Sequence, residues 1–302
     1  MSSLIEPHGG VLVDGVLDEI EAGALAVRSS ALPSLVLDSQ ELLDLELLAS
    51  GGASPLRGFM GHGDYRSVLD RQRLASGVLF PVPLTLAVPD KRLDALAPGT
   101  EVALRDAKGA LRGAIAVRET FVRDVREEAH LLYGTDDPSH RGVSYLLSRP
   151  RSALGGEVTL LRPRTRVFET AREVRQRLTQ DGFFRVAAGF VAGVPEAANT
   201  ALDQVDALLV QSLAGDVALA PRFPVVLARL PLASRQAGAR DALLHALVLR
   251  NFGVTHLVLD ASRADLATAD VLVRFQRELG LVFVHGTGRA ASATLIDTRA
   301  AA

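Results

Sequence analysis

The stretch "ARDALLHALVLRNFGVTHLVLD" (residues 239–260) decides the fold class of this chain. Its first part is apolar at helical spacing and is closed by Gly253, since glycine readily adopts the backbone that ends a helix. The segment "HLVLD" that follows has the apolar character of a buried strand. A helix that leads directly into a buried strand is the repeating unit of a parallel α/β sheet.

The same alternation extends in both directions from this stretch. An apolar stripe from Phe168 to Leu178 indicates a helix that ends near Gly182, and the strand "FRVAAGF" follows it. Alternation of this kind predicts a parallel sheet with right-handed crossovers, whose ligand crevice lies beyond the carboxyl ends of the strands. Further strands are predicted at "DALLVQS", "FPVVLARL" and "LVFVHG", and further helices near Pro195 and over "ADLATADVLVRFQRELG".

The chain before about Pro163 is expected to contain mostly short strands and turns. Strands are predicted at "PVPLTLAV" (residues 81–88), "EVALRD" (residues 101–106) and "LRGAIAVRETFVRD" after a glycine turn. One helix is predicted over "DYRSVLDRQRLASG", with Gly77 at its end. We therefore predict a β-rich domain over residues 1–163 and a parallel α/β domain over residues 164–302.

Composition excludes several classes of function. The 302 residues are 48% hydrophobic and 23% charged, which is typical of a folded chain. A formal charge of −2 gives no reason to expect nucleic acid or an anionic membrane as partner. The absence of cysteine excludes disulfides, thiolate catalysis and Cys-ligated metals. With no signal-peptide pattern and no apolar run near the roughly 20 residues of a membrane helix, a cytoplasmic location is expected.

The turn after the strand "FRVAAGF" is where an α/β protein would hold a phosphate. Gly189 and Gly193 occupy it, but the stretch matches neither GxGxxG nor GxxxxGK[ST]. Glu196 is expected in the first turn of the next helix, where two like charges about 4 Å apart repel by about 4 kcal/mol at an effective dielectric constant near 20. A structural turn is therefore predicted there in preference to a phosphate site.

Other candidate side chains give weaker signals. No two of the seven histidines have the three- or four-residue spacing of a helical metal site, so no metal is predicted. No GxSxG nucleophile motif occurs. Arg235 and Arg240 flank Ala237 and Gly238 just before a helix, and guanidinium groups bind phosphate or sulfate in a bidentate manner. These residues are the anion- or nucleotide-binding candidates, with surface solvation as the open alternative.

Several motifs resemble those of one enzyme family. "IEPHGGVLV", "DLELLASGGASPLRGFM" (residues 44–60), "YGTDDPSHRGV" (residues 133–143) and "AGARDALLHALVLRNFGVTHLVL" (residues 237–259) occur in that order. They resemble ATP sulfurylase, the sulfate adenylyltransferase that joins sulfate to the α-phosphate of ATP and releases pyrophosphate. The resemblance implies a PUA-like β domain followed by a Rossmann-like nucleotidyltransferase domain.

The chain departs from this family at the catalytic motifs. Active members read approximately QTRNPxHRAH in the turn discussed above, where the side chains serve sulfate, nucleotide and phosphates. A second signature, approximately GRDHAG, falls on "DASRAD" (residues 260–265), where only Arg263 offers a substitute for the histidine. The segment around Arg235, Ala237, Gly238 and Arg240 persists. The five replaced positions of the first motif are Phe190, Ala192, Gly193, Glu196 and Asn199.

The leading hypothesis is a sulfurylase-like pseudoenzyme with a binding, scaffolding or regulatory role linked to sulfur metabolism. Its expected partners are another protein, a second copy of the chain, or a small anion near Arg235 and Arg240. The alternative is a divergent active adenylyltransferase or nucleotidyltransferase with a rebuilt site, and ATP and magnesium are expected as cofactors only in that case. An RNA-binding role for the PUA-like domain is disfavoured by the 5% aromatic content and the negative charge.

Overall fold

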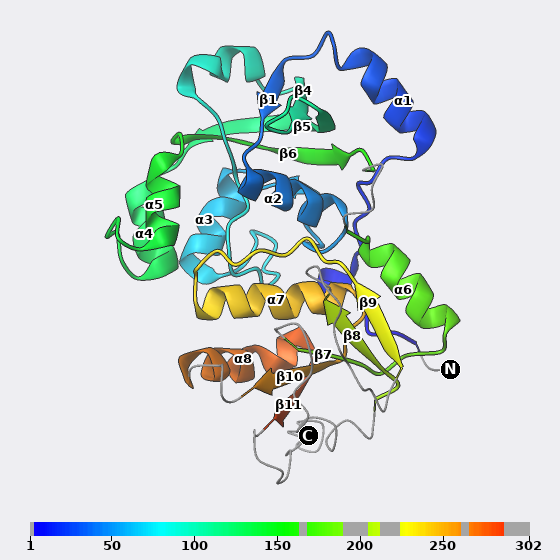
Figure 1. Ribbon diagram of the computed structural model, residues 1–302. Helices are drawn as coiled ribbons and strands as arrows, with labels where there is room; N and C mark the ends of the chain where they lie inside the picture. The colour runs from blue at the N-terminus through cyan, green and yellow to red at the C-terminus, as the bar shows by residue number, and fades with distance from the viewer. Residues whose placement is uncertain (1–2, 163–167, 190–204, 212–223, 261–265, 287–302) are drawn as a thin grey trace. The chain divides into compact units, whose positions relative to one another are not determined.

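A computed structural model describes residues 3–162, 168–189, 205–211, 224–260 and 266–286 (Figure 1). The chain divides into two compact units. We call the first the β-rich unit, which comprises Val13–Arg166 and Pro231–Leu244. We call the second the parallel unit, which comprises Met1–Leu12, Val167–Leu230 and His245–Ala302.

The β-rich unit is built on one mixed sheet with the strand order β1-β4-β5-β6-β2, and β3 also pairs with β6. β1 and β4 are parallel, whereas the other neighbours are antiparallel. The long β5–β6 ladder forms the centre, where alternate side chains such as Ile115, Val117 and Val158 are buried. The strands are β1 (Ser34–Val36), β2 (Gly58–Phe59), β3 (Leu86–Ala87), β4 (Glu101–Arg105), β5 (Leu111–Val122) and β6 (Ser152–Leu160).

Helices contribute more to this unit than the sequence analysis predicted. Of the α-helices listed at the end of this paragraph, only α3 was predicted. The signal for two others was present, because Asp18 with Glu21 and Asp38 with Glu41 form reciprocal capping boxes at the starts of α1 and α2. The helices are α1 (Glu19–Arg28), α2 (Ser39–Ala49), α3 (His62–Arg71), η2 (Asp90–Leu96), α4 (Val125–Tyr133) and α5 (Arg141–Ser148).

Two predicted elements of this unit are shorter than expected. The helix predicted to end at Gly77 ends instead at Arg71, and the next residue, Gln72, caps it with a left-handed backbone (φ 56°) and an N–H that donates to the carbonyl of Val68. The strand predicted over residues 81–88 is reduced to β3, because Pro81 and Pro83 have no N–H to donate to a ladder.

The parallel unit confirms the predicted alternation. The five strands in the described part of this unit are all parallel, in the order β11-β10-β7-β8-β9. Buried Val186, Leu208 and Leu257 show the continuous apolar character expected of strands covered on both faces. The elements are η1 (His8–Gly10), α6 (Ala171–Gln180), β7 (Val186–Gly189), β8 (Ala207–Gln211), β9 (Val225–Ala228), α7 (Ala239–Asn251, which begins in the β-rich unit), β10 (His256–Asp260), α8 (Leu266–Leu279) and β11 (Val282–Gly286).

The structure groups two segments differently from the predicted division at residue 163. The first twelve residues belong to the parallel unit, where the His8 amide donates to Asn251 Oδ1 at 2.8 Å. Pro231–Leu244 belongs to the β-rich unit, where Arg240 Nη2 donates to the carbonyl of Leu69 at 3.2 Å. Both groupings depend on hydrogen bonds between residues far apart in sequence, which local patterns do not reveal.

The predicted ligand crevice follows the carboxyl ends of the parallel strands. The residues after β7, β8 and β10 lie outside the described ranges, and so does the helix predicted near Pro195. Among the helices that are described, none is both long enough and apolar enough to cross a membrane.

Candidate functional site

The replaced motif positions cannot be placed on the fold. All five lie within residues 190–204, outside the described ranges, and Arg263 lies within residues 261–265. Asp260, the first residue of the second signature, ends β10. The interpretation of these positions therefore stays a prediction from sequence. They are Phe190, Ala192, Gly193, Glu196 and Asn199.

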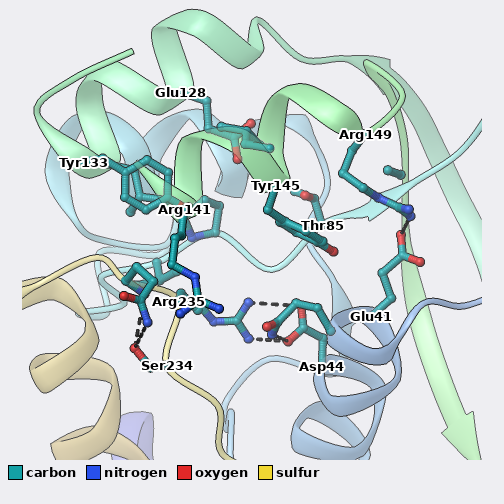
Figure 2. A pocket seen from close by; sticks show the side chains of 18 of the residues that line it. Glu41, Asp44, Thr85, Glu128, Tyr133, Arg141, Tyr145, Arg149, Ser234 and Arg235 are labelled. Carbon is teal, nitrogen blue, oxygen red and sulfur yellow. Dashed lines mark hydrogen bonds and ion pairs between the residues drawn. The ribbon is translucent and has the colours of Figure 1, made fainter. Parts of the chain in front are cut away.

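Arg235, a predicted anion-binding residue, is buried and paired with a carboxylate of its own unit. Its Nη1 donates to Asp44 Oδ2 at 3.1 Å and its Nη2 donates to Asp44 Oδ1 (Figure 2). The two side chains are only 11% and 6% exposed. Although burial works against the charge, the Asp44 carboxylate holds the pKa of Arg235 above its ordinary value. The guanidinium group therefore has its counter-ion within the fold.

Arg240, in the first turn of α7, donates to backbone carbonyls. Its Nη1 lies 3.4 Å from Val68 O and 3.3 Å from Pro81 O, and its Nη2 lies 3.2 Å from Leu69 O. Val68 and Leu69 belong to the last turn of α3, where the Val68 carbonyl also accepts the cap amide of Gln72. Burial lowers the pKa of Arg240 from its ordinary value.

The segment between these two arginines is also structural. Ala237 is 7% exposed, and its amide donates to Asp241 Oδ2 at 3.2 Å. Gly238 has a φ of 55°, which favours glycine. The structure thus brings all four predicted residues into the β-rich unit. Anion binding by them remains a prediction that no contact tests.

The sequence analysis missed a cavity of about 330 Å³ in this unit. It is bounded by α2, α4 and α5 together with residues 234–236, all of which belong to the β-rich unit (Figure 2). Only Arg235 among its lining residues was a predicted site residue. The charged and aromatic lining residues are Glu41, Asp44, Arg123, Glu128, Tyr133, Arg141, Tyr145, Arg149 and Arg235.

Each carboxylate that lines the cavity already has an arginine partner. Besides the Arg235–Asp44 pair, Arg149 pairs with Glu41, and Arg123 Nη1 lies 3.5 Å from Glu128 Oε2. Arg149 also pairs with Asp38 at 3.1 Å, just outside the lining. These pairs neutralise the carboxylates in place.

Arg141 is the exception among the arginines of the cavity. It begins α5, and its side chain makes no hydrogen bond or ion pair with any residue that the structure describes. Tyr133, which ends α4, also lines the cavity, and burial raises the pKa of Tyr133 to about 12, although the charge of Arg235 opposes the shift. Its hydroxyl likewise has no hydrogen-bond partner among the described residues.

The packing of α4 against α5 fixes the position of Tyr133. Ala129, Val143 and Leu146 form the apolar contact between the helices. The Tyr133 and His140 rings also contact each other, with 4.9 Å between their centroids and a tilt of 40°. A Cβ atom at Gly142 would lie 2.6 Å from Tyr133 Cζ, which is closer than real Cβ contacts come. Glycine at this position is therefore what lets the tyrosine ring lie against the start of α5.

Glu128 gives this unit a predicted pH dependence. Its side chain is 4% exposed, accepts a hydrogen bond from the Tyr65 hydroxyl at 2.9 Å, and has its pKa raised by burial. The folded state therefore holds this proton more tightly than the unfolded state, and stability falls as pH rises above about 4.3 through the raised pKa. We expect Glu128→Gln to make this dependence shallower by up to about 1.4 kcal/mol per pH unit, measured by urea unfolding across pH.

The matched control is Glu127→Gln, which removes the neighbouring carboxylate. Glu127 is 47% exposed and pairs with Arg66 on the surface at 2.7 Å. Its loss is expected to leave the slope of stability against pH close to that of the native sequence. An unchanged slope in Glu128→Gln would show that the buried carboxyl does not titrate differently in the two states.

No group of histidine, aspartate and glutamate side chains in the described ranges is arranged to hold a metal ion. The cavity carboxylates are consistent with this, because their oxygens accept from arginines. The chemistry that this arrangement supports is the binding of an anion by a guanidinium and a phenol.

Comparison with known proteins agrees with this architecture. Residues 5–163 match the family described as PUA-like domain, and residues 198–279 match the family described as ATP-sulfurylase. The sulfate adenylyltransferase of Symbiobacterium thermophilum is 37% identical over 297 residues, which cover 89% of this chain and 75% of that protein. The sulfate adenylyltransferase of Synechococcus sp. (strain JA-3-3Ab) is 34% identical, with 87% of this chain and 74% of that protein covered.

A solved structure supports the same assignment. The hexameric APS kinase from Thiobacillus denitrificans aligns with a TM-score of 0.68 and 27% identity. The alignment covers 93% of this chain but only 56% of that one, so this chain spans little more than half of its length. A PUA-like unit, a parallel α/β unit and relatives at this level of identity together lead to one conclusion: the chain belongs to the sulfate adenylyltransferase (ATP sulfurylase) family.

Proposed function

We propose that this protein is a binding member of its family that does not carry out ordinary transfer of an adenylyl group from ATP to sulfate. One observation carries the proposal: between Phe190 and Asn199 the sequence has no lysine, arginine, histidine or glutamine. The resemblance to ATP sulfurylase assigns the contacts with sulfate and phosphates to this stretch. An acid, Glu196, is present instead.

The physical reason lies in how adenylyl transfer is accelerated. The protein positions the reactants and supplies donors to the charge that develops on the phosphoryl oxygens. Removing one such donor costs on the order of a hundred- to a thousandfold in rate. Here all five matched positions are replaced. We therefore expect the rate to fall at least as far as it would after the loss of one of these donors alone.

The two arginines that persist do not offer an evident replacement. Arg235 is engaged by Asp44 and Arg240 by three carbonyls, all within the β-rich unit. Releasing Arg235 to a phosphate would leave Asp44 buried without its counter-ion, which is strongly unfavourable. This supports a structural role for the pair over a catalytic one.

ATP–pyrophosphate exchange in the presence of sulfate and magnesium tests the proposal. The sulfate adenylyltransferase of Symbiobacterium thermophilum serves as the positive control at the same protein concentration. We expect this protein to exchange at least about a thousandfold more slowly, while its cooperative thermal unfolding shows that it is folded. Exchange at a rate comparable to the control contradicts the proposal and favours the divergent enzyme with a rebuilt site, for which ATP and magnesium would be the cofactors.

The role that we propose in place of catalysis is binding, linked to sulfur metabolism through the family. The solved relative is described as a hexamer, which supports association with further copies of this chain or with a related protein. The identity of the partner stays a prediction.

A further inference from the structure

We propose that the cavity of the β-rich unit binds a small organic acid that carries one negative charge on an oxyanion group and has an apolar body. The oxyanion would be held by Arg141 and Tyr133. Both residues lie within residues 5–163, which match the PUA-like domain family, and neither belongs to the replaced catalytic motif. The test of this site is therefore separate from the test of adenylyl transfer.

The first support is Arg141, an exposed arginine of the lining that has no counter-ion among the described residues. Arg123, Arg149 and Arg235 each pair with a carboxylate, whereas Arg141 has no partner among the described residues. Guanidinium groups bind planar oxyanions through two parallel hydrogen bonds. Because the other three arginines of the lining are paired with carboxylates, Arg141 is left to bind a ligand with a single negative charge.

The second support is the hydroxyl of Tyr133. In Figure 2, Tyr133 and Arg141 lie on one side of the cavity, and Glu41 and Arg149 lie on the other. The tyrosine ring is held by the α4–α5 packing and by the close approach at Gly142. A tyrosine hydroxyl is protonated at neutral pH, so Tyr133 can donate a hydrogen bond to an oxyanion in the cavity.

The third support is the apolar part of the lining. Val82, Pro83, Leu132 and Leu146 contribute to the walls. The cavity volume of about 330 Å³ lies at the lower end of the range of about 300–1,000 Å³ that is typical of small-molecule sites. A bare inorganic anion would leave these walls without contact, and a polymer would not fit. An acid with a compact hydrocarbon or aromatic body uses both the charge and the walls.

The test measures binding of defined probes by isothermal titration calorimetry. The anionic probes are benzoate, 3-phenylpropanoate and phenyl sulfate, which distinguish a carboxylate from a sulfate ester. Benzamide is the neutral counterpart, and inorganic sulfate lacks the apolar body. We expect at least one anionic probe to bind at least tenfold more tightly than benzamide and inorganic sulfate.

Variants locate the site. Arg141→Gln is expected to weaken binding of that probe by about ten- to a hundredfold, because a charge-assisted hydrogen bond is lost. Tyr133→Phe is expected to weaken binding by a smaller factor. Arg126→Gln is the matched control, because Arg126 is on α4, is 71% exposed and pairs with Asp136 at 3.4 Å. It removes the same charge and is expected to leave binding unchanged.

Several outcomes would overturn the proposal. These are no binding by any of the three anionic probes, equal binding of benzamide, and equal losses in Arg141→Gln and Arg126→Gln. All variants are first compared with the native sequence by thermal unfolding. If Arg141→Gln unfolds, Tyr133→Phe still tests the site, because it keeps the packed ring. Failure here leaves the exchange assay, and hence the proposed loss of adenylyl transfer, unaffected.

Discussion

Asp44→Ala is expected to lower the free energy of unfolding by about 3–5 kcal/mol, because it leaves the buried charge of Arg235 without a counter-ion. The Asp44 side chain is 6% exposed and accepts hydrogen bonds from both terminal nitrogens of the Arg235 guanidinium. Equilibrium unfolding in urea, followed by circular dichroism, measures the loss.

Two comparisons make this prediction specific. Asp70→Ala removes a carboxylate that is 47% exposed and pairs with Arg66 on α3, and its effect is expected within about 1 kcal/mol. The double variant Asp44→Leu with Arg235→Met replaces the ion pair by apolar side chains and is expected to recover most of the stability. A loss below about 1 kcal/mol in Asp44→Ala would show that Arg235 finds another partner or reaches solvent.

Arg240→Ala is expected to cost about 2–4 kcal/mol of stability, because three backbone carbonyls lose a charged donor. Those of Val68 and Leu69 lie in the last turn of α3, where the negative end of the helix also favours a cation. Arg240→Lys keeps the charge but not the planar fork, so an intermediate loss is expected. The same urea unfolding experiment measures both.

The control for Arg240 is Arg118→Ala on β5. Arg118 is 69% exposed and pairs with Glu157 at 2.7 Å, so its removal is expected to change stability by less than about 1 kcal/mol. Unchanged stability in Arg240→Ala, combined with weakened binding of inorganic phosphate or sulfate, would contradict the structural role and restore the anion-binding prediction from sequence.

These two predictions bear on how the family resemblance is interpreted. The segment from Arg235 to Arg240 resembles ATP sulfurylase closely, and in this fold it closes the β-rich unit. The contacts of Arg235 and Arg240 give this segment a role in the fold, whereas the stretch from Phe190 to Asn199 lies outside the described residues.

Local patterns predicted the elements of the parallel unit well but those of the β-rich unit poorly. The apolar runs at β7, β8 and β10 are nearly continuous because both faces of a parallel sheet are covered, and such runs are visible in sequence. In the other unit, α4 and α5 have only 9 and 8 residues, so their apolar spacing does not repeat over enough turns to stand out in the sequence. Their capping residues, such as Asp124, were the better signal.

The sequence by itself determined the α/β alternation and the exclusion of cysteine chemistry, and it predicts the loss of the catalytic motif, because each depends on which residues occur and at what local spacing. Only the tertiary structure decided where Arg235 and Arg141 lie. Arg235 meets a carboxylate 191 positions away in the chain, whereas Arg141 meets none among the described residues. The physical reason is that the state of a charged side chain depends on neighbours brought together by folding, and no local spacing specifies them.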